Sequence, residues 1–249
     1  MKYIPILAFL LASPLSTLAQ DDQNMTTADL LQSQKDFLNL PEEQRDEFAE
    51  HYKQAAQYFQ QKRIFETLDS LDEASKILEK NVAILNLYGS CYVEMRAFDK
   101  ALTAFRKAQE LDPKNRSVNF NIAEVLFVTH NWQEAHDALV DVSKKIPEED
   151  ISLGRLVEFK ILLCKIRLEK DAEVTALSEK YDYQDDSPFY YYAKAAIAYD
   201  AEEEEEAAEW LARANRIFQN PNLIAPWQDT LVEFGYIKSF YGEDLIPTE

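Results

Sequence analysis

Glycine is scarce in this sequence: among 249 residues it occurs four times, at Gly89, Gly154, Gly235 and Gly242. A sheet-rich fold uses glycine in many tight turns, and phosphate-binding loops use it where the backbone approaches the ligand. The sequence contains no phosphate-loop or dinucleotide-binding glycine pattern. The scarcity therefore favours helices and argues against nucleotide binding of these kinds.

Positive charge is scarce as well. Asp and Glu number 45 against 26 Lys and Arg, which gives a formal net charge of −19 at pH 7. A chain this acidic repels the phosphate backbone of nucleic acids and the anionic surface of membranes. We therefore expect no nucleic-acid partner, and we attribute most of the charge to solubility.

The sequence has two cysteines, Cys91 and Cys164, which are 73 residues apart. Both fall within helical patterns. If they lie on first helices of hairpins that do not adjoin, their Cα atoms are too far apart for a disulfide. We expect two separate buried thiols, and a disulfide is the alternative because export suggests an oxidising compartment.

The longest apolar run lies at the beginning of the sequence. Lys2 supplies a positive charge, residues 4–12 are almost continuously apolar, and residues 16–19 form an exit ending in Ala19. This pattern predicts a cleaved signal peptide over residues 1–19, and hence a periplasmic or secreted protein. The alternative is an uncleaved anchor, but the run is shorter than the roughly 20 apolar residues of a spanning helix. No later run is long enough, so we expect no membrane insertion after cleavage.

An internal period of 34 residues is the strongest pattern in the sequence. Pro113 and Pro147 are 34 residues apart, and so are Ala101 and Ala135, each of which follows a polar turn. The same offset relates four further pairs: Phe105 with Leu139, Ala108 with Val142, Gly89 with Ala123, and Tyr92 with Leu126.

Each period is predicted to form a helical hairpin. Within residues 82–115, apolar and small residues recur at steps of three and four, which gives each of two helices one apolar stripe. The small Gly89 and Ala101 allow the two helices to approach closely. Pro113 ends the second helix, because proline disfavours helical geometry in the residue before it.

This hairpin resembles a tetratricopeptide repeat. Its residues at the signature positions of that family are Leu85, Tyr88, Gly89, Tyr92, Ala101, Phe105, Ala108 and Pro113. The first two of these replace the family's usual tryptophan and leucine. Residues 116–149 are a second good match, while residues 48–81 and 188–221 match more loosely. Residues 150–187 form a degenerate hairpin about four residues longer than the period.

The resemblance implies an all-α fold, a right-handed superhelix (α-solenoid) of about five such hairpins. We predict a polar N-terminal segment over residues 20–40, with one or two helical turns in it, and the solenoid over residues 41–249. A C-terminal capping helix is predicted over residues 224–241, starting at Pro226, because a terminal hairpin cannot bury its outer face alone.

The sequence shows no catalytic constellation. His130 and His136 are six residues apart, a spacing that does not place them on one helix face. A zinc site is the alternative to two solvated histidines. The acidic run at residues 202–206 lies where a helix starts, and negative charge is favourable there. A weak calcium site or a patch for a basic partner is the alternative, although the run lacks a calcium-loop glycine. We expect no catalytic residue, metal or cofactor, and therefore no enzyme.

The resemblance also implies a concave groove lined by the first helix of each hairpin. Its predicted partner-binding residues are Tyr52, Phe59, Asn86, Val93, Phe120, Glu124, Phe127, Tyr192 and Tyr199. Further acidic residues, Glu94, Glu158 and Asp200, lie beside them. An aromatic groove with an acidic fringe suits an extended or helical peptide that carries apolar anchors and some positive charge.

We therefore predict a non-catalytic scaffold or adaptor, in the cell envelope or secreted, that binds a protein or peptide partner. Two alternatives stay open. The groove aromatics could instead pack against neighbouring helices or against a folded-back N-terminal segment. The protein could also be a self-assembling structural component, in which case it forms a homo-oligomer.

Overall fold

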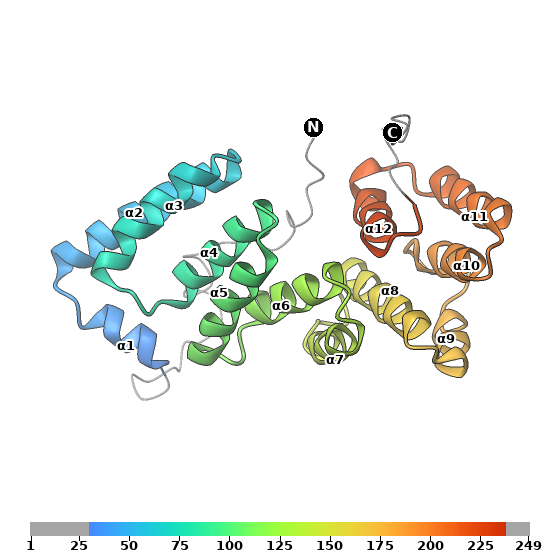
Figure 1. Cartoon of the computed structure of the whole chain (residues 1–249), viewed down its shortest axis with the longest axis horizontal. Helices are drawn as coiled ribbons and strands as arrows, with labels where there is room; N and C mark the ends of the chain where they lie inside the picture. Colours follow the sequence, from blue (N-terminus) through green and yellow to red (C-terminus); the bar gives the residue numbers. More distant parts are fainter. Residues whose placement is uncertain (1–29, 238–249) are drawn as a thin grey trace, which may run out of the picture. The chain divides into compact units, whose positions relative to one another are not determined.

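The computed structural model describes residues 30–237, and every regular element within that range is an α-helix. The predicted signal peptide and the last residues of the predicted cap lie outside the described range. The chain divides into two compact units, one ending at Val125 and one beginning at Leu126 (Figure 1). The prediction of an all-α solenoid of hairpins with a closing helix is confirmed.

Unit 1 is built from two complete hairpins. The short α1 (Gln32–Leu38) precedes α2 (Glu42–Gln60) and α3 (Ile64–Ile77), which pack against each other. The second hairpin consists of α4 (Val82–Glu94) and α5 (Phe98–Leu111), and α4 also contacts α3. Most of α6 (Arg116–Val128) belongs to this unit as well.

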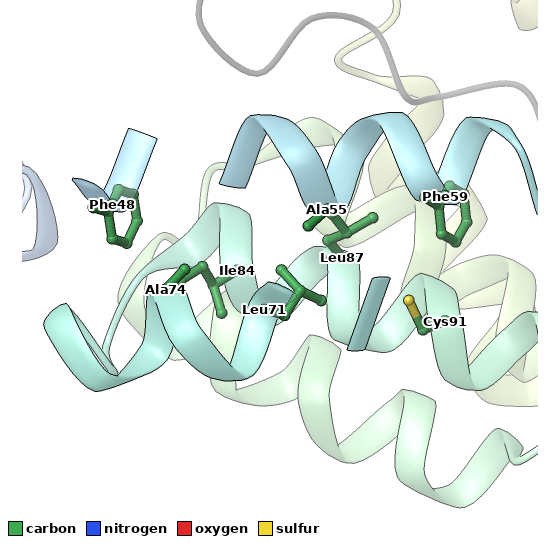
Figure 2. Packing of buried hydrophobic residues seen from close by; sticks show 8 residues of the cluster. All are labelled: Phe48, Ala55, Phe59, Leu71, Ala74, Ile84, Leu87 and Cys91. Atoms are coloured by element: carbon green, nitrogen blue, oxygen red, sulfur yellow. The ribbon is translucent and has the colours of Figure 1, made fainter. Parts of the chain in front are cut away.

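The core of unit 1 lies between the two hairpins. Its buried residues come from α2, α3 and α4 (Figure 2): Phe48, Ala55, Phe59, Leu71, Ala74, Ile84, Leu87 and Cys91. Within the second hairpin, a Cβ atom added at Gly89 would lie 2.3–2.7 Å from three ring atoms of Phe105. The helices are therefore as close at Gly89 as the sequence predicts, and any larger residue there would collide with the ring.

One turn geometry recurs between the two helices of all five described hairpins. In the second hairpin, the Arg96 amide donates to the Val93 carbonyl and the Ala97 amide donates to the Tyr92 carbonyl, both at 2.8 Å. This is the Schellman pattern, which requires a left-handed residue. The left-handed residues, with φ between 55° and 62°, are Lys62, Arg96, His130, Glu169 and Glu202. None is glycine, which is how the chain makes these turns with so little of it.

Unit 2 contains the end of α6 and six further helices. These are α7 (Trp132–Ser143), α8 (Ile151–Arg167), α9 (Asp171–Ser178), α10 (Phe189–Asp200), α11 (Glu204–Ile217) and α12 (Pro221–Phe234). α8 packs against α7 and α10, and α10 packs against α11. The acidic run lies in the first turn of α11, as predicted from the helix dipole.

The closing helix α12 begins earlier than predicted. Asn220 caps it by accepting a hydrogen bond from the Asn222 amide at 3.0 Å, and Pro221 occupies its first turn. The prediction that Pro226 starts the helix is therefore wrong, because Asn-Pro five residues earlier supplies both a cap and a favourable first residue. Pro226 lies inside α12, which ends at the left-handed Gly235 (φ 91°).

Candidate partner-binding face

Most of the predicted groove residues are not on the surface. Six are buried: Phe59, Val93, Phe120, Glu124, Phe127 and Tyr192. The other three, Tyr52, Asn86 and Tyr199, are half-buried. For the buried aromatics the alternative holds, namely packing against other helices of the same chain. Their role in binding a partner stays a prediction.

In unit 2, each predicted aromatic contacts the closing helix or the residue just after its cap. The ring centroid of Phe127 lies 6.1 Å from that of Phe234, with the rings stacked. The centroids of Tyr192 and Trp227 are 5.4 Å apart. Tyr199 stacks on Tyr236, which follows Gly235, at 5.3 Å. Phe127, Tyr192 and Tyr199 therefore receive a helix, and that helix belongs to their own chain.

We call the side chains that receive this helix the α12 platform: Phe127, Trp132, Phe159, Lys160, Tyr192 and Tyr199. Phe159 lies 5.3 Å from Trp227, and Trp132 lies 5.1 Å from Phe234, measured between ring centroids. The platform is also packed within itself, because Phe159 contacts Tyr192 at 5.9 Å and Phe127 contacts Trp132 at 5.6 Å.

The α12 helix meets this platform with one apolar stripe. Ile224, Trp227, Leu231 and Phe234 are all at most 4% exposed. Their steps of three and four residues place them on one side of the helix, which is the pattern of a helix seated in a groove. Burying each such side chain contributes about 1.5–3 kcal/mol, so apolar contact dominates the attachment of α12.

A buried ion pair accompanies the apolar stripe. The Lys160 ammonium lies 3.3 Å from a carboxylate oxygen of Glu233, and their side chains are 4% and 7% exposed. The same ammonium is 4.7 Å above the Phe127 ring. Arg167 lies 4.5 Å above the Phe234 ring and donates to the Phe234 carbonyl at 3.5 Å, where the negative end of the helix dipole favours a cation. The face that holds α12 thus presents cations to it.

Burial beneath α12 shifts several pKa values. Burial raises the pKa of the Tyr192 phenol, and the nearby Asp229 carboxylate adds to the effect. Burial likewise raises the pKa of Asp229 itself, an effect that Lys160 opposes. Burial and the Asp200 carboxylate raise the pKa of Tyr236, whose hydroxyl donates to Asp200 at 3.2 Å. These phenols therefore stay protonated at neutral pH.

The first helices of unit 1 carry more polar contacts. The Asn121 amide donates to the Asn86 side-chain oxygen at 2.9 Å, and the Ser90 hydroxyl donates to the Asn86 carbonyl at 3.1 Å. Tyr52 stacks on Phe48 with ring centroids 6.5 Å apart, and burial raises the pKa of its phenol to about 12. Phe48 in turn contacts Phe37 of α1 at 5.4 Å.

The predicted acidic fringe is largely engaged with this chain's own groups. Glu94 pairs with Lys62 at 2.8 Å. Glu158 pairs with Lys180 at 2.5 Å and lies 3.7 Å from Arg155. These carboxylates already have cationic partners, so the expectation that the fringe would select a positively charged peptide loses its basis in these two residues.

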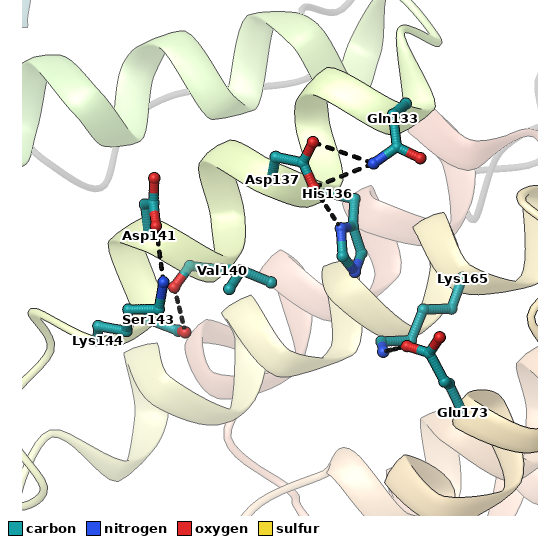
Figure 3. A network of polar contacts seen from close by, with 9 residues as sticks. All are labelled: Gln133, His136, Asp137, Val140, Asp141, Ser143, Lys144, Lys165 and Glu173. Carbon is teal, nitrogen blue, oxygen red and sulfur yellow. Dashed lines mark hydrogen bonds and ion pairs between the residues drawn. The ribbon is translucent and has the colours of Figure 1, made fainter.

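The histidines and cysteines do not come together. The His130 ring stacks on Trp132 at 4.8 Å, whereas His136 hydrogen bonds Asp137 at 2.9 Å through Nδ1 (Figure 3). That bond, helped by Gln133, lowers the pKa of Asp137. Cys91 and Cys164 are free and buried, as expected. Within residues 30–237, no cluster of three histidine, cysteine or acidic residues has the geometry of a metal site.

Sequence reasoning missed the charged part of the platform. Lys160 lies in the apolar run Phe159–Ile166 of α8, where seven of the eight residues are buried. A lysine inside such a run is a signal for a buried partner, but the partner Glu233 is 73 residues away. No local spacing rule connects the two.

Repeated hairpins, a recurrent left-handed turn and the tight Gly89–Phe105 contact define a helical-repeat protein. Residues 82–115 match the family model of the tetratricopeptide repeat. The chain is therefore a tetratricopeptide-repeat protein. In the part that the structure describes, no helix has both the length and the apolarity to cross a membrane.

Among solved structures, the chain resembles PilF of Pseudomonas aeruginosa with a TM-score of 0.52 and 16% identity, over 78% of this chain and 94% of that one. It resembles YrrB, described as a tetratricopeptide-repeat protein with an unusual peptide-binding site (0.49, 18%, over 70% and 87%). A tetratricopeptide-repeat protein of Parabacteroides merdae gives 0.48 and 16%, over 74% and 69%. At these identities the PilF likeness shows the fold alone, and the two lower scores carry no argument. No curated protein sequence matches the chain.

Proposed function

We propose that this chain is a non-catalytic protein-interaction scaffold of the cell envelope or the extracellular space, and that it binds a helical segment of a partner protein. The observation that carries the proposal is the seat of α12. Three aromatic positions predicted to face a partner, Phe127, Tyr192 and Tyr199, hold a helix through aromatic contacts. A surface that seats one amphipathic helix has the chemistry to seat another.

Photo-crosslinking from within the native host tests the interaction. A photoreactive phenylalanine analogue at the half-buried Tyr199 should capture a foreign protein, and the same probe at Tyr183, which is 65% exposed, serves as the matched control. The captured protein should then bind the purified chain and lose that binding when Tyr199 is replaced by Ala.

Two results would contradict this scaffold. Capture of a second copy of the chain, with light scattering that grows with concentration, would favour a self-assembling component. Equal capture from Tyr199 and Tyr183 would mean that the aromatic position has no special role.

The export part of the proposal rests on the signal pattern over residues 1–19. N-terminal sequencing of the protein recovered from its host should give Gln20 as the first residue. A mature protein that retains Met1 in the cytoplasmic fraction would overturn this part and leave the binding part intact.

A further inference from the structure

The α12 helix is attached to its unit differently from the helices before it. Those of α2 to α11 form hairpins, whereas α12 has no second helix of its own and packs mainly on α8. The link from α11 is short and ends in Gln219 and Asn220, both exposed. Detaching α12 would therefore break no hairpin and would need movement only in this link.

The α12 helix also contains features that weaken a permanent core helix. Pro226 lies inside it, where proline cannot donate the helical hydrogen bond and its ring crowds the preceding turn. Asp229 is desolvated by docking. The Lys160–Glu233 pair is buried, and such a pair is often no more stabilising than an apolar contact of the same size. Local rules are broken in this way mainly at functional sites.

The α12 platform has packing of its own that does not depend on α12. Phe159 contacts Tyr192, and Trp132 contacts both Phe127 and His130. A platform that stays ordered without its occupant can receive another helix.

We propose that α12 is a displaceable, built-in occupant of the partner site, and that the partner is an acidic amphipathic helix of the same pattern. This inference rests on the proposed function, and it names the partner's chemistry. The competing helix carries two aromatic residues seven positions apart, in the place of Trp227 and Phe234. It also carries a carboxylate just before the second aromatic, because the buried Lys160 ammonium requires one.

A covalent link gives α12 a strong advantage over any free competitor. A helix tethered by a few residues acts at an effective concentration of about millimolar, so a free helix of equal intrinsic affinity binds weakly until the tether is cut. The occupied platform is thus a closed state, and a partner opens it by competing for the same rings.

Cutting the tether tests the proposal with the chain's own helix as the probe. A protease site is inserted between Gln219 and Asn220 of the full chain, and a fluorescent peptide of residues 220–237 is titrated before and after cleavage. We expect cleavage to tighten apparent binding of the peptide at least about tenfold. Peptides with Trp227→Ala plus Phe234→Ala, or with Glu233→Gln, should bind more weakly, and Asn222→Ser, an exposed position, should not.

Amide hydrogen exchange on the intact chain provides a second measurement that needs no variant. If α12 detaches as a unit, the amides of its last turns exchange at least about tenfold faster than those of α8. Equal protection of α12 and α8 would overturn the proposal. So would a cut chain that loses its helical structure, or one that stays folded and never exchanges its helix for the peptide.

These outcomes are separable from the fate of the proposed function. Exchange of α12 without any crosslinked partner would support the displaceable helix and leave the scaffold without a client. A crosslinked partner together with a permanently protected α12 would support the scaffold and reject displacement.

Discussion

The two units bury the aromatic residues of their first helices by different means. In unit 1, Phe59 is covered by the hairpins themselves, in one cluster with Leu71 and Leu87. In unit 2, Phe127 and Tyr192 are covered by an additional helix that belongs to no hairpin. The same repeat position is therefore ordinary core in one unit and a seat for a helix in the other, and the repeat pattern alone does not distinguish them.

The units also differ in how they place charge. The Lys62–Glu94 pair of unit 1 lies at a turn, with the lysine side chain 48% exposed. The Lys160–Glu233 pair of unit 2 is almost completely buried. Water screens the first pair, so it contributes little, whereas the second becomes costly as soon as one partner is missing. Charge in unit 1 is thus incidental to the fold, and in unit 2 it fixes what the platform accepts.

Truncating one buried ring in each unit should separate the two kinds of core most clearly. We expect Phe59→Ala to cost about 3–5 kcal/mol, lost from the hairpins of unit 1, because a large buried ring leaves a cavity. Trp227→Ala should cost a similar amount, lost first from α12. Hydrogen exchange locates each effect, and loss of protection in α2–α5 caused by Trp227→Ala would contradict the division.

Removing one lysine from each ion pair should give unequal effects. We expect Lys160→Met to weaken the attachment of α12 by about 3–5 kcal/mol, because Glu233 is left buried and unpaired. Lys62→Met should change stability by only about 0–1 kcal/mol. Denaturant unfolding followed in each unit measures both, and Lys160→Met combined with Glu233→Gln should recover much of the loss. Equal effects of the two lysine variants would mean that the burial difference is irrelevant.

The two helical glycines provide a matched pair with opposite expected signs. Gly89→Ala should destabilise unit 1 by about 1–3 kcal/mol, because the new Cβ collides with the Phe105 ring. At Gly154 the new Cβ would meet only Ile146, at 3.9 Å. Gly154→Ala should therefore stabilise unit 2 by about 0.5–1 kcal/mol through helix propensity. Thermal unfolding of both variants checks the signs, and a stabilising Gly89→Ala would show that the Phe105 ring yields easily.

The smallest effect concerns pH and should appear only in unit 2. Burial raises the pKa of Asp229 in the docked state, so docking takes up protons and is most favourable below the ordinary aspartate pKa of about 3.9. The contribution is lost as pH rises through the raised value. Asp229→Asn should therefore strengthen α12 protection at pH 7 and leave it unchanged near pH 3. A difference between the proteins that did not depend on pH would contradict this cause.

Much of the fold could be predicted because it depends on local spacing. The offset between Ala101 and Ala135 placed the hairpins, and the small Gly89 predicted the close contact with Phe105. The closing helix was expected from its apolar stripe, although its start was misplaced because Pro226 was given more weight than the Asn220–Pro221 cap. Each of these features involves residues within one hairpin or its neighbour.

The candidate site depends on contacts that spacing does not encode. An aromatic at the position of Tyr192 has the same sequence signature whether it faces solvent, a partner or α12. The return of α12 onto α8 brings Glu233 to Lys160 across 73 residues, and it reverses the expected charge of the partner from basic to acidic. Local periodicity can therefore identify the residues of the face but not what covers them.

The left-handed turns between paired helices have a consequence for how this protein can vary. All five residues at these turns are exposed, and in sequence order they are Lys62, Arg96, His130, Glu169 and Glu202. The Schellman bonds use only the backbone, so each position tolerates almost any side chain at a conformational cost of about 1 kcal/mol. The chain thus has five sites at which mutation can reverse the surface charge, one hairpin at a time, while the helices beneath keep the same packing.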